Sequence, residues 1–450
     1  LYKILNKHVL KDPLISRNLI GLSTDNASYF KGGNEGLYGR LLDDYKNLFY
    51  QTCCCHNLSL TAEAALEVVD KGIIDLLSIL SREFSHSNCK KAAFKIIQED
   101  LELKTITPKK WVDSRWLSLE IFLQDFFNQL EAFKKYYKDQ GEEDVVKALT
   151  KKTNISFIAF LKIMTEKICT YNKIFQSDNI DTLTLHNTIR TLFMDLYRMI
   201  ILEEFSYLSF EQARNELENI NIDSNSLIND DDFFCELRLR LKNLYDLNSL
   251  NVQEKKIFIQ QAKSYIITCL KELVRYLPIQ DKTVDSFKVL SLKNFSRPAW
   301  IALIERFPNL VRPDANKVLD EVSKLLALDL SDFHKKSFRD PFQMWEEFLK
   351  DFGKEFQNLY FLATNILALP CSTAIVERQF KSLKSVKNDE RSSLKENTLE
   401  SILIAKDCFT NEIIQDRRIV NKIYAQLRQA NKGKQEMKPK EGEDLEDEAN

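Results

Sequence analysis

Glycine and proline are scarce in this chain, which contains 10 Gly and 9 Pro among 450 residues. Ordinary proteins use these two residues for roughly a tenth of all positions. Their scarcity argues against a fold built from many tight turns and favours long helices.

The chain also lacks a long uninterrupted apolar run and an excess of charge of one sign. Its longest apolar stretch, Phe361 to Val376, is broken by Asn365 and Pro370 and is too short to span a bilayer. The 64 basic residues nearly balance the 66 acidic ones, so any contact with DNA must come from local basic patches. The 9 cysteines, an odd number without a secretory pattern, fit a reduced cytosolic or nuclear compartment.

A predicted helix follows Pro370 near the end of the chain. Proline fixes an extended approach, and Ser372 or Thr373 can cap the first amide groups of the helix. Glu377, in the first turns, is either a partner of the helix dipole or a metal ligand facing a cleft, and the residue alone does not decide between these roles. Helical spacing places Val376, Phe380 and Leu383 on one apolar stripe and Glu377, Lys381 and Lys384 on a neighbouring polar one.

A second acidic residue lies near the start of the chain. Residues Asn18 to Thr24 form a short apolar run that predicts a strand buried on both faces, and Asp25 follows it directly. Ligand-binding groups in open α/β sheets gather at the carboxyl ends of strands. An aspartate after an apolar run is nevertheless more often a turn residue or a helix cap.

Two further motifs stand between these ends. Cys53 and His56 begin a Cys-x-x-His-x-Leu pattern at the end of another apolar segment. Arg115 and Trp116 open a long amphipathic stretch that predicts a helix.

These motifs, in this order, resemble those of hAT-type DNA transposases. Leu369 to Ala405 is similar to the family's C-terminal dimerisation and catalytic segment, and Thr24 to Ala27 is similar to the sequence around its second catalytic aspartate. The resemblance implies a mainly α fold with a partial α/β core, in which a ribonuclease-H-like core is interrupted by a large all-helical insertion. It divides the chain into residues 1–58 as the N-terminal part of the core without its first strands, 59–340 as the insertion, 341–430 as the C-terminal core helices and dimerisation region, and 431–450 as a disordered charged tail.

Strand transfer of this kind uses three carboxylates that hold two divalent metal ions. The resemblance makes Asp25 and Glu377 two of these catalytic, metal-binding residues, with Mg²⁺ or Mn²⁺ as the cofactor of an active full-length protein. The residues before this strand, with Ile4, Leu5, His8 and Val9 at helical spacing, are predicted to form a helix rather than the strand that carries the first aspartate. We therefore expect the chain as given to hold no cofactor and to cleave no DNA by itself, and Leu1 in place of a methionine favours a fragment of a longer protein.

The resemblance also implies contacts with DNA. Trp116 would stack on a base flipped out of the duplex with Arg115 near a phosphate, although Trp116 is equally expected to anchor its helix in the core. Arg378, Lys381 and Lys384 would line a DNA path beside Glu377, or form a solvated helix face.

Cys53 and His56 are expected to support the core without performing a chemical step. With His86 and Cys89 they also have the ligand types of a four-coordinate zinc site. A small buried thiol at a strand end is the simpler interpretation of Cys53.

The segment after the predicted helix contains more apolar residues than one helix requires for a single buried stripe. In the family this segment interlocks two subunits, and we expect a homodimer through Ser372 to Phe409. The residues expected to bury themselves between subunits are Phe380, Leu394, Leu399, Ile402 and Leu403.

Apolar spacing of three and four residues predicts further helices in the middle of the chain, over 155–175, 183–204, 233–247 and 252–277. A proline-marked stretch, 278–337, is predicted to be less regular. The sequence thus predicts an hAT-transposase-derived nuclear protein that acts by dimerisation and by binding DNA or nuclear proteins. No association with a membrane is expected. The alternatives are a fragment of an active two-metal transposase and a helical scaffold unrelated to transposition.

Overall fold

The structure of the protein is a computed structural model. It describes residues 2–387 apart from 32–35, 86, 112–115, 178–179 and 312–313, together with residue 399, and at 29, 31, 116 and 117 it describes the backbone alone. The chain divides into two compact units, Leu1–Ala374 and Ile375–Asn450.

Strands β1 (Gly21–Thr24) and β2 (Phe49–Thr52) pair in parallel, with Gly21 opposite Phe49 and Thr24 opposite Thr52. Parallel strands require a crossover connection, and α3 (Ser28–Lys31) and α4 (Leu37–Asp44) lie within it. The predicted strand before Asp25 is confirmed, but its expected burial on both faces is wrong. Of the four residues of β1, only Thr24 is buried. The sheet has two strands in the described residues, so neighbouring strands cover little of β1.

Two short helices precede β1, where the sequence predicted one. They are α1 (Tyr2–His8) and α2 (Pro13–Asn18). Asp12 caps α2, because its carboxylate accepts a hydrogen bond from the Leu14 N–H at 2.8 Å. A small core joins these helices to α4 through Leu10, Leu37, Leu41 and Leu48.

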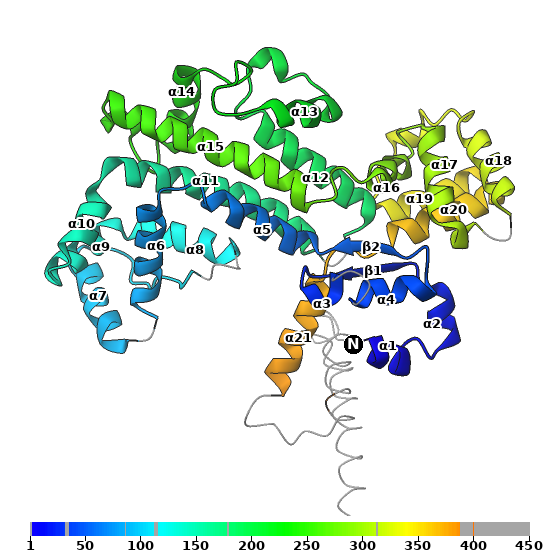
Figure 1. Cartoon of the computed structure of the whole chain (residues 1–450), viewed down its shortest axis with the longest axis horizontal. Coiled ribbons are helices and arrows are strands. Elements are labelled where there is room, and N and C mark those ends of the chain that lie inside the picture. The colour runs from blue at the N-terminus through cyan, green and yellow to red at the C-terminus, as the bar shows by residue number, and fades with distance from the viewer. Residues whose placement is uncertain are drawn as a thin grey trace, which may run out of the picture. The chain divides into compact units, whose positions relative to one another are not determined.

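A large helical body follows β2 and has its own continuous apolar core. Its central helices α5, α11 and α15 pack against one another and run side by side in Figure 1. The helices predicted over 155–175 and 252–277 are confirmed, whereas the other two end early, at Tyr197 and Leu241. The helices of this body are α5 (Cys54–Leu66), α6 (Lys71–Glu83), α7 (Asn88–Asp100), α8 (Trp116–Asn128), α9 (Leu130–Asp139), α10 (Glu143–Thr150), α11 (Lys152–Phe175), α12 (Thr182–Tyr197), α13 (Phe210–Glu216), α14 (Asp230–Leu241) and α15 (Val252–Tyr276).

A second apolar core lies in residues 284–369, around Trp300 and Trp345. The two indole rings meet edge to face with centroids 6.2 Å apart. The expectation of a less regular stretch at 278–337 is wrong, because Pro298 stands in the first turn of a helix, where a missing N–H costs nothing. The helices are α16 (Lys282–Ser286), α17 (Arg297–Arg306), α18 (Ala315–Leu325), α19 (Pro341–Phe352) and α20 (Gln357–Leu367).

Helix α21 (Ala374–Val386) is the described part of the second unit. It starts as predicted, with the Ala374 N–H donating to Ser372 Oγ at 3.1 Å. The mainly helical character of the chain is confirmed. The ribonuclease-H-like core and the domain boundaries stay predictions, and the tail at 431–450 lies outside the described residues.

Candidate functional site at the end of the parallel strands

Polar side chains gather where β1 and β2 end. The Cys53 N–H donates to the Thr24 carbonyl at 2.7 Å, which continues the hydrogen bonding of the two strands. The hydroxyls of Thr24 and Tyr50 lie 2.7 Å apart. Burial raises the pKa of the Tyr50 phenol, and the carboxylate of Asp25 raises it further. Tyr50 is therefore a neutral hydrogen-bond partner beside the acidic residue.

Asp25 forms the turn that leaves β1. Its Oδ1 accepts a hydrogen bond from the Ala27 N–H at 3.0 Å, and the side chain is half-buried. This is the turn role that an aspartate after a strand commonly plays. The bond occupies one carboxylate oxygen, and no hydrogen bond to Oδ2 occurs among the described residues, so this oxygen can serve as a metal ligand.

Asn57, which the sequence analysis did not single out, connects this turn to the helical body. It is fully buried, and its Nδ2 donates to Thr52 Oγ1 and to the Tyr276 carbonyl, both at 2.7 Å. Its Oδ1 accepts from Asn26 Nδ2 at 2.6 Å. A buried amide with all three bonds made orients its neighbours. The sequence feature that could have revealed this residue is an asparagine next to His56 on the otherwise apolar, inward face of a helix.

The Cys-x-x-His motif meets the segment that precedes α21. The Thr373 N–H donates to Cys53 Sγ at 3.3 Å. Cys55 Sγ and Ser372 Oγ also lie 3.3 Å apart, and the backbone N–H of Cys54 reaches the carbonyl of the buried Cys371 at 3.4 Å. Two motifs from opposite ends of the sequence therefore form one junction.

The Cys53 side chain is negatively charged at this junction. Its buried sulfur accepts hydrogen bonds from the Cys55 thiol, from the hydroxyl and N–H of Thr373 and from the His56 N–H, and these donors, led by Cys55, lower the pKa of Cys53 to about 5 against the effect of burial. The pKa of Cys55 is raised, mainly because its thiol donates to Cys53. At neutral pH Cys53 is therefore a thiolate and Cys55 a thiol.

Gly21 allows the same segment to lie against β1. A Cβ atom at this position would be 2.8 Å from Leu369 Cδ2 and 2.8 Å from Pro370 Cδ. Real Cβ contacts are not that short, so a side chain cannot be added here without a shift of the proline ring or of β1.

The predicted site residues are distributed over both units. Cys53 joins the junction, and His56 is half-buried in the first turn of α5. Glu377 and Lys381 are exposed on α21 in the second unit, where Arg378 is half-buried and Lys384 exposed. The expected approach of Glu377 to Asp25 stays a prediction.

Other predicted residues lie outside the described part of the structure. Trp116 begins α8, but its side chain is not described. Arg115, His86, Leu394, Ile402 and Leu403 lie outside the described residues, and Leu399 is described as a single helical position. Cys89 is exposed. Within the described ranges, His, Cys, Asp and Glu side chains do not form a group of three that could hold a metal ion.

Two buried glutamines form hydrogen bonds with the segment 103–111, which precedes the Arg-Trp motif. Gln98 Nε2 donates to the Ile106 carbonyl at 3.0 Å and to Gln129 Oε1 at 2.9 Å. Gln129 Nε2 donates to the Lys104 carbonyl at 2.9 Å. The extended segment 103–111 is therefore fixed to the ends of α7 and α9.

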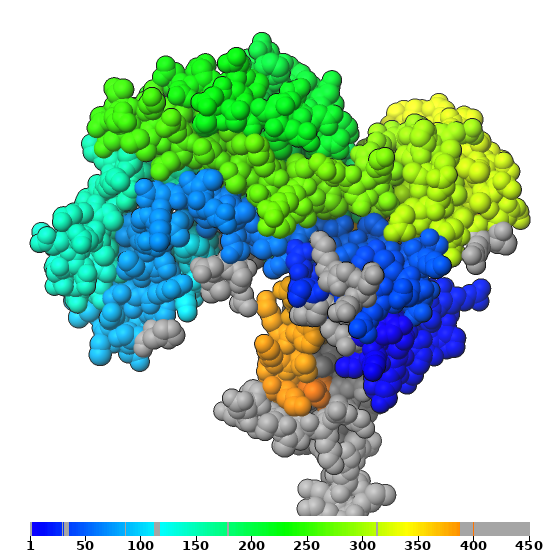
Figure 2. Space-filling model, viewed as in Figure 1, coloured from blue at the N-terminus to red at the C-terminus, as the bar shows by residue number. Residues whose placement is uncertain are grey.

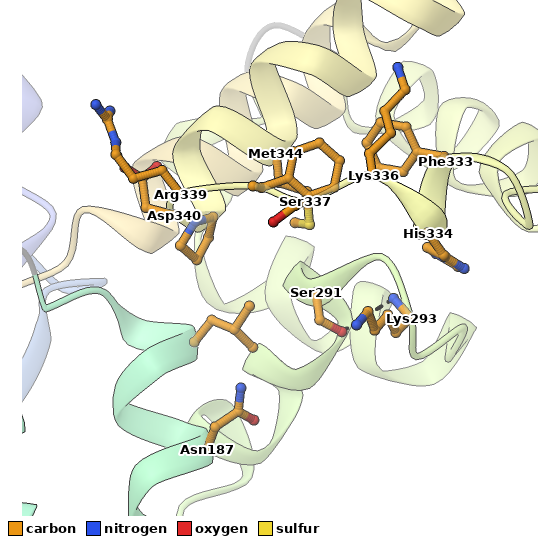
Figure 3. A pocket seen from close by; sticks show the side chains of 13 residues that line it. Asn187, Ser291, Lys293, Phe333, His334, Lys336, Ser337, Arg339, Asp340 and Met344 are labelled. Atoms are coloured by element: carbon orange, nitrogen blue, oxygen red, sulfur yellow. Dashed lines mark hydrogen bonds and ion pairs between the residues drawn. The ribbon is translucent and has the colours of Figure 1, made fainter.

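A separate pocket of about 470 Å³ lies between α12 and the segment that enters α19. Figure 3 shows Asn187 and Ser291 on one side of it and Ser337 and Met344 on the other. Two of its cations are matched by acids, because Lys336 pairs with Asp351 and Arg339 Nε lies 2.9 Å from Asp340.

The geometry defines a mainly helical protein in which a remote C-terminal segment is fastened to the end of a small parallel sheet. Residues 321–409 match the family model of the hAT family C-terminal dimerisation region. This match supports the predicted relationship to hAT-family transposases, because the chain contains their C-terminal dimerisation region. A comparison with curated proteins found no match.

None of the described helices combines the length and the apolar character that crossing a membrane requires.

Proposed function

We propose that the protein acts in the nucleus as a homodimer that binds DNA and nuclear proteins, on a scaffold that retains part of a ribonuclease-H-like core. The observation that supports this proposal best is the junction between Cys53 and Thr373. It fastens a segment within the dimerisation region to the packed body of the chain. Pairing of two such regions would therefore hold two bodies together, and with them two DNA-binding surfaces.

The surface of α21 supports the dimer. Val376 and Phe380 lie one helical turn apart and are 52% and 58% exposed in the single chain. Burying a large apolar side chain contributes roughly 1.5–3 kcal/mol. A second copy of the same helix, which carries the same stripe, is the partner expected for a dimerisation region.

The mass of the full chain in solution tests the dimer. Sedimentation equilibrium should give twice the chain mass at micromolar concentration, and the dimer should dissociate on dilution with a single constant. A chain mass that stays monomeric over this range contradicts the proposal. DNA binding is tested separately, by fluorescence anisotropy with a labelled duplex at low salt, and the absence of any anisotropy change contradicts that part.

Metal-dependent strand cleavage is a second candidate function, favoured by the position of Asp25 directly after β1. Hard carboxylate oxygens are the ligands that Mg²⁺ and Mn²⁺ prefer. In this proposal Asp25 and Glu377 each contribute a carboxylate, and a third comes from sequence upstream of Leu1. Glu377 follows Thr373 by four residues, so the chain alone keeps its Cα within roughly 14 Å of the Cα of Thr373.

Asp25→Asn separates the metal-binding role from the turn role. The amide oxygen can still accept the Ala27 N–H bond, whereas the charge that attracts a cation is removed. Calorimetric titration with Mn²⁺ should show weak binding to the wild-type chain that the variant loses, while the melting temperatures without metal agree. Equal Mn²⁺ binding by both chains contradicts the metal role of Asp25.

A further inference from the structure

The N-terminal helices carry an excess of basic side chains. Lys3 and Lys7 on α1, Lys11 in the following turn and Arg17 on α2 are all exposed. Asp12 is the acidic residue of this segment, and its carboxylate is occupied as the cap of α2. None of the four cations forms an ion pair with a carboxylate in the part of the chain that the structure describes.

Some exposed lysines elsewhere in the chain are ion-paired. Four of them form ion pairs along their own helices or turns, with N–O distances between 2.6 and 3.6 Å: Lys95 with Glu99, Lys147 with Asp144, Lys335 with Asp332 and Lys350 with Glu347. The chain as a whole has a formal charge of −2. The four cations of the N-terminal segment, with Asp12 as its acidic residue, make it a local positive surface.

The apolar side chains of the segment do not form a continuous outer face. Leu10 is buried against α4, and Tyr2 and Leu5 pack on the same core. Ile4, Val9, Leu14 and Ile15 are exposed, at 63%, 39%, 70% and 44%, but the helices of the segment have only 7 and 6 residues. Helices that lie on a membrane present a broad uninterrupted apolar face, which the inward packing of Leu5 and Leu10 interrupts.

The neighbouring helix α4 does not neutralise this surface. It carries Asp43 and Asp44, and the Tyr2 hydroxyl donates a hydrogen bond to Asp44. Lys46 follows this helix directly, so the basic residues Lys3, Lys7, Lys11, Arg17 and Lys46 outnumber the carboxylates of Asp12, Asp43 and Asp44. Figure 2 shows the N-terminal segment, in the darkest blue, at the molecular surface.

We propose that α1 and α2 form a nucleic-acid-binding surface, hereafter the N-terminal basic surface, in which Lys3, Lys7, Lys11 and Arg17 contact backbone phosphates. Lys3 and Lys7 are one turn apart and share a face of α1. The polar side chains of Asn6 and Asn18 are exposed among the cations and can donate hydrogen bonds to phosphate oxygens. The surface reads no base sequence, because phosphate contacts position a protein without specifying bases. This inference rests on the proposed DNA binding and assigns it a surface.

The dependence of DNA affinity on salt tests the proposal. Each phosphate contact contributes about −0.9 to the slope of log affinity against log salt concentration. A full-length variant with Lys3→Gln, Lys7→Gln, Lys11→Gln and Arg17→Gln should therefore have a slope shallower by about 3 to 4 than the wild type, measured by anisotropy between about 50 and 200 mM salt. The loss should be the same for unrelated duplex sequences.

A matched variant controls for the loss of charge. Lys95→Gln, Lys147→Gln, Lys335→Gln and Lys350→Gln together remove the same four charges from ion-paired positions, and the slope should change by less than about 1. All eight positions are exposed, so circular dichroism should show both variants folded. If both variants change the slope equally, general charge carries the effect and the proposal is wrong.

The remaining outcomes separate this inference from the function on which it rests. If the wild type binds no DNA, the proposed DNA binding fails and this inference fails with it. If the wild type binds DNA and the basic-surface variant keeps its slope, only this inference fails. Co-sedimentation with phosphatidylserine-containing vesicles that depends on the four cations, combined with an unchanged DNA slope, would instead assign the surface to a membrane and overturn the proposal.

Discussion

The backbone N–H of Thr373 donates a hydrogen bond to Cys53 Sγ across 3.3 Å, between residues 320 positions apart in the sequence. Cys53 stands at the start of α5, where the positive end of the helix dipole also favours a negative sulfur. One buried thiolate therefore connects the end of the parallel strands to the segment that precedes α21, within the dimerisation region.

Replacing Cys53 by serine should remove the thiolate of this residue at neutral pH. The wild-type chain should absorb more strongly in the ultraviolet thiolate band than Cys53→Ser, and this difference should disappear as the pH falls through about 5. Cys169→Ser, at a position where burial raises the pKa of the thiol to about 12, should leave the band at pH 7 unchanged. A Cys53→Ser spectrum equal to that of the wild type at pH 7 contradicts the thiolate assignment.

The same thiolate should make stability depend on pH. The pKa of Cys53 falls from the ordinary thiol value of 9.0 to about 5 in the folded chain, so between these values the unfolded chain binds more protons and stability rises with pH. The contribution is complete above pH 9 and is lost as the pH falls to about 5. In urea unfolding, the stability difference between wild type and Cys53→Ser should therefore grow from pH 5 to pH 9, and a constant difference would contradict this.

Gly21→Ala should destabilise the contact between β1 and the segment before α21. The added methyl group would overlap Leu369 Cδ2 and the stiff ring of Pro370, and overpacking of this kind costs roughly 1–3 kcal/mol. Leu369→Ala in the same chain should recover part of the loss, because neighbouring substitutions do not add. Urea unfolding of the two single variants and the double variant measures this, and full additivity would argue against the contact.

Asn57→Ala should loosen the turn that carries Asp25. It removes the partner of Asn26 and of polar atoms of the half-buried Thr52 and Tyr276, at about 1–3 kcal/mol for each group that is left unpaired away from water. Hydrogen exchange of the amides of residues 25–27 should accelerate. Asn215→Ala, at an exposed position, should change neither stability nor exchange by a measurable amount, and equal protection in Asn57→Ala would refute the role of this amide.

Phe380→Glu should weaken the dimer. The ring is 58% exposed on α21, so the substitution disturbs the single chain little, whereas a dimer that buries the position would have to bury an unpaired carboxylate. Leu239→Glu, at a position 64% exposed on α14 and outside the matched region, is the control. Sedimentation should show a higher dissociation constant for Phe380→Glu alone, and equal constants would place the interface elsewhere.

The local patterns predicted what depends on near neighbours in the sequence. The start of α21 after Pro370, the cap at Ser372 and the strand before Asp25 follow from turn chemistry and apolar spacing. The prolines of 278–337 misled the prediction, since a proline in the first turn of a helix and a proline in a loop look alike without the flanking packing.

The sequence by itself determined the family, the helical character and the motifs at the two ends of the chain. Only the tertiary structure decided that Cys53 meets Thr373, that Gly21 makes room for Pro370 and that Asn57 holds the turn of Asp25. Helix periodicity and capping are encoded within a few residues, whereas a thiol becomes a thiolate only when distant donors converge on it in a buried place. Such convergence is a property of the folded chain.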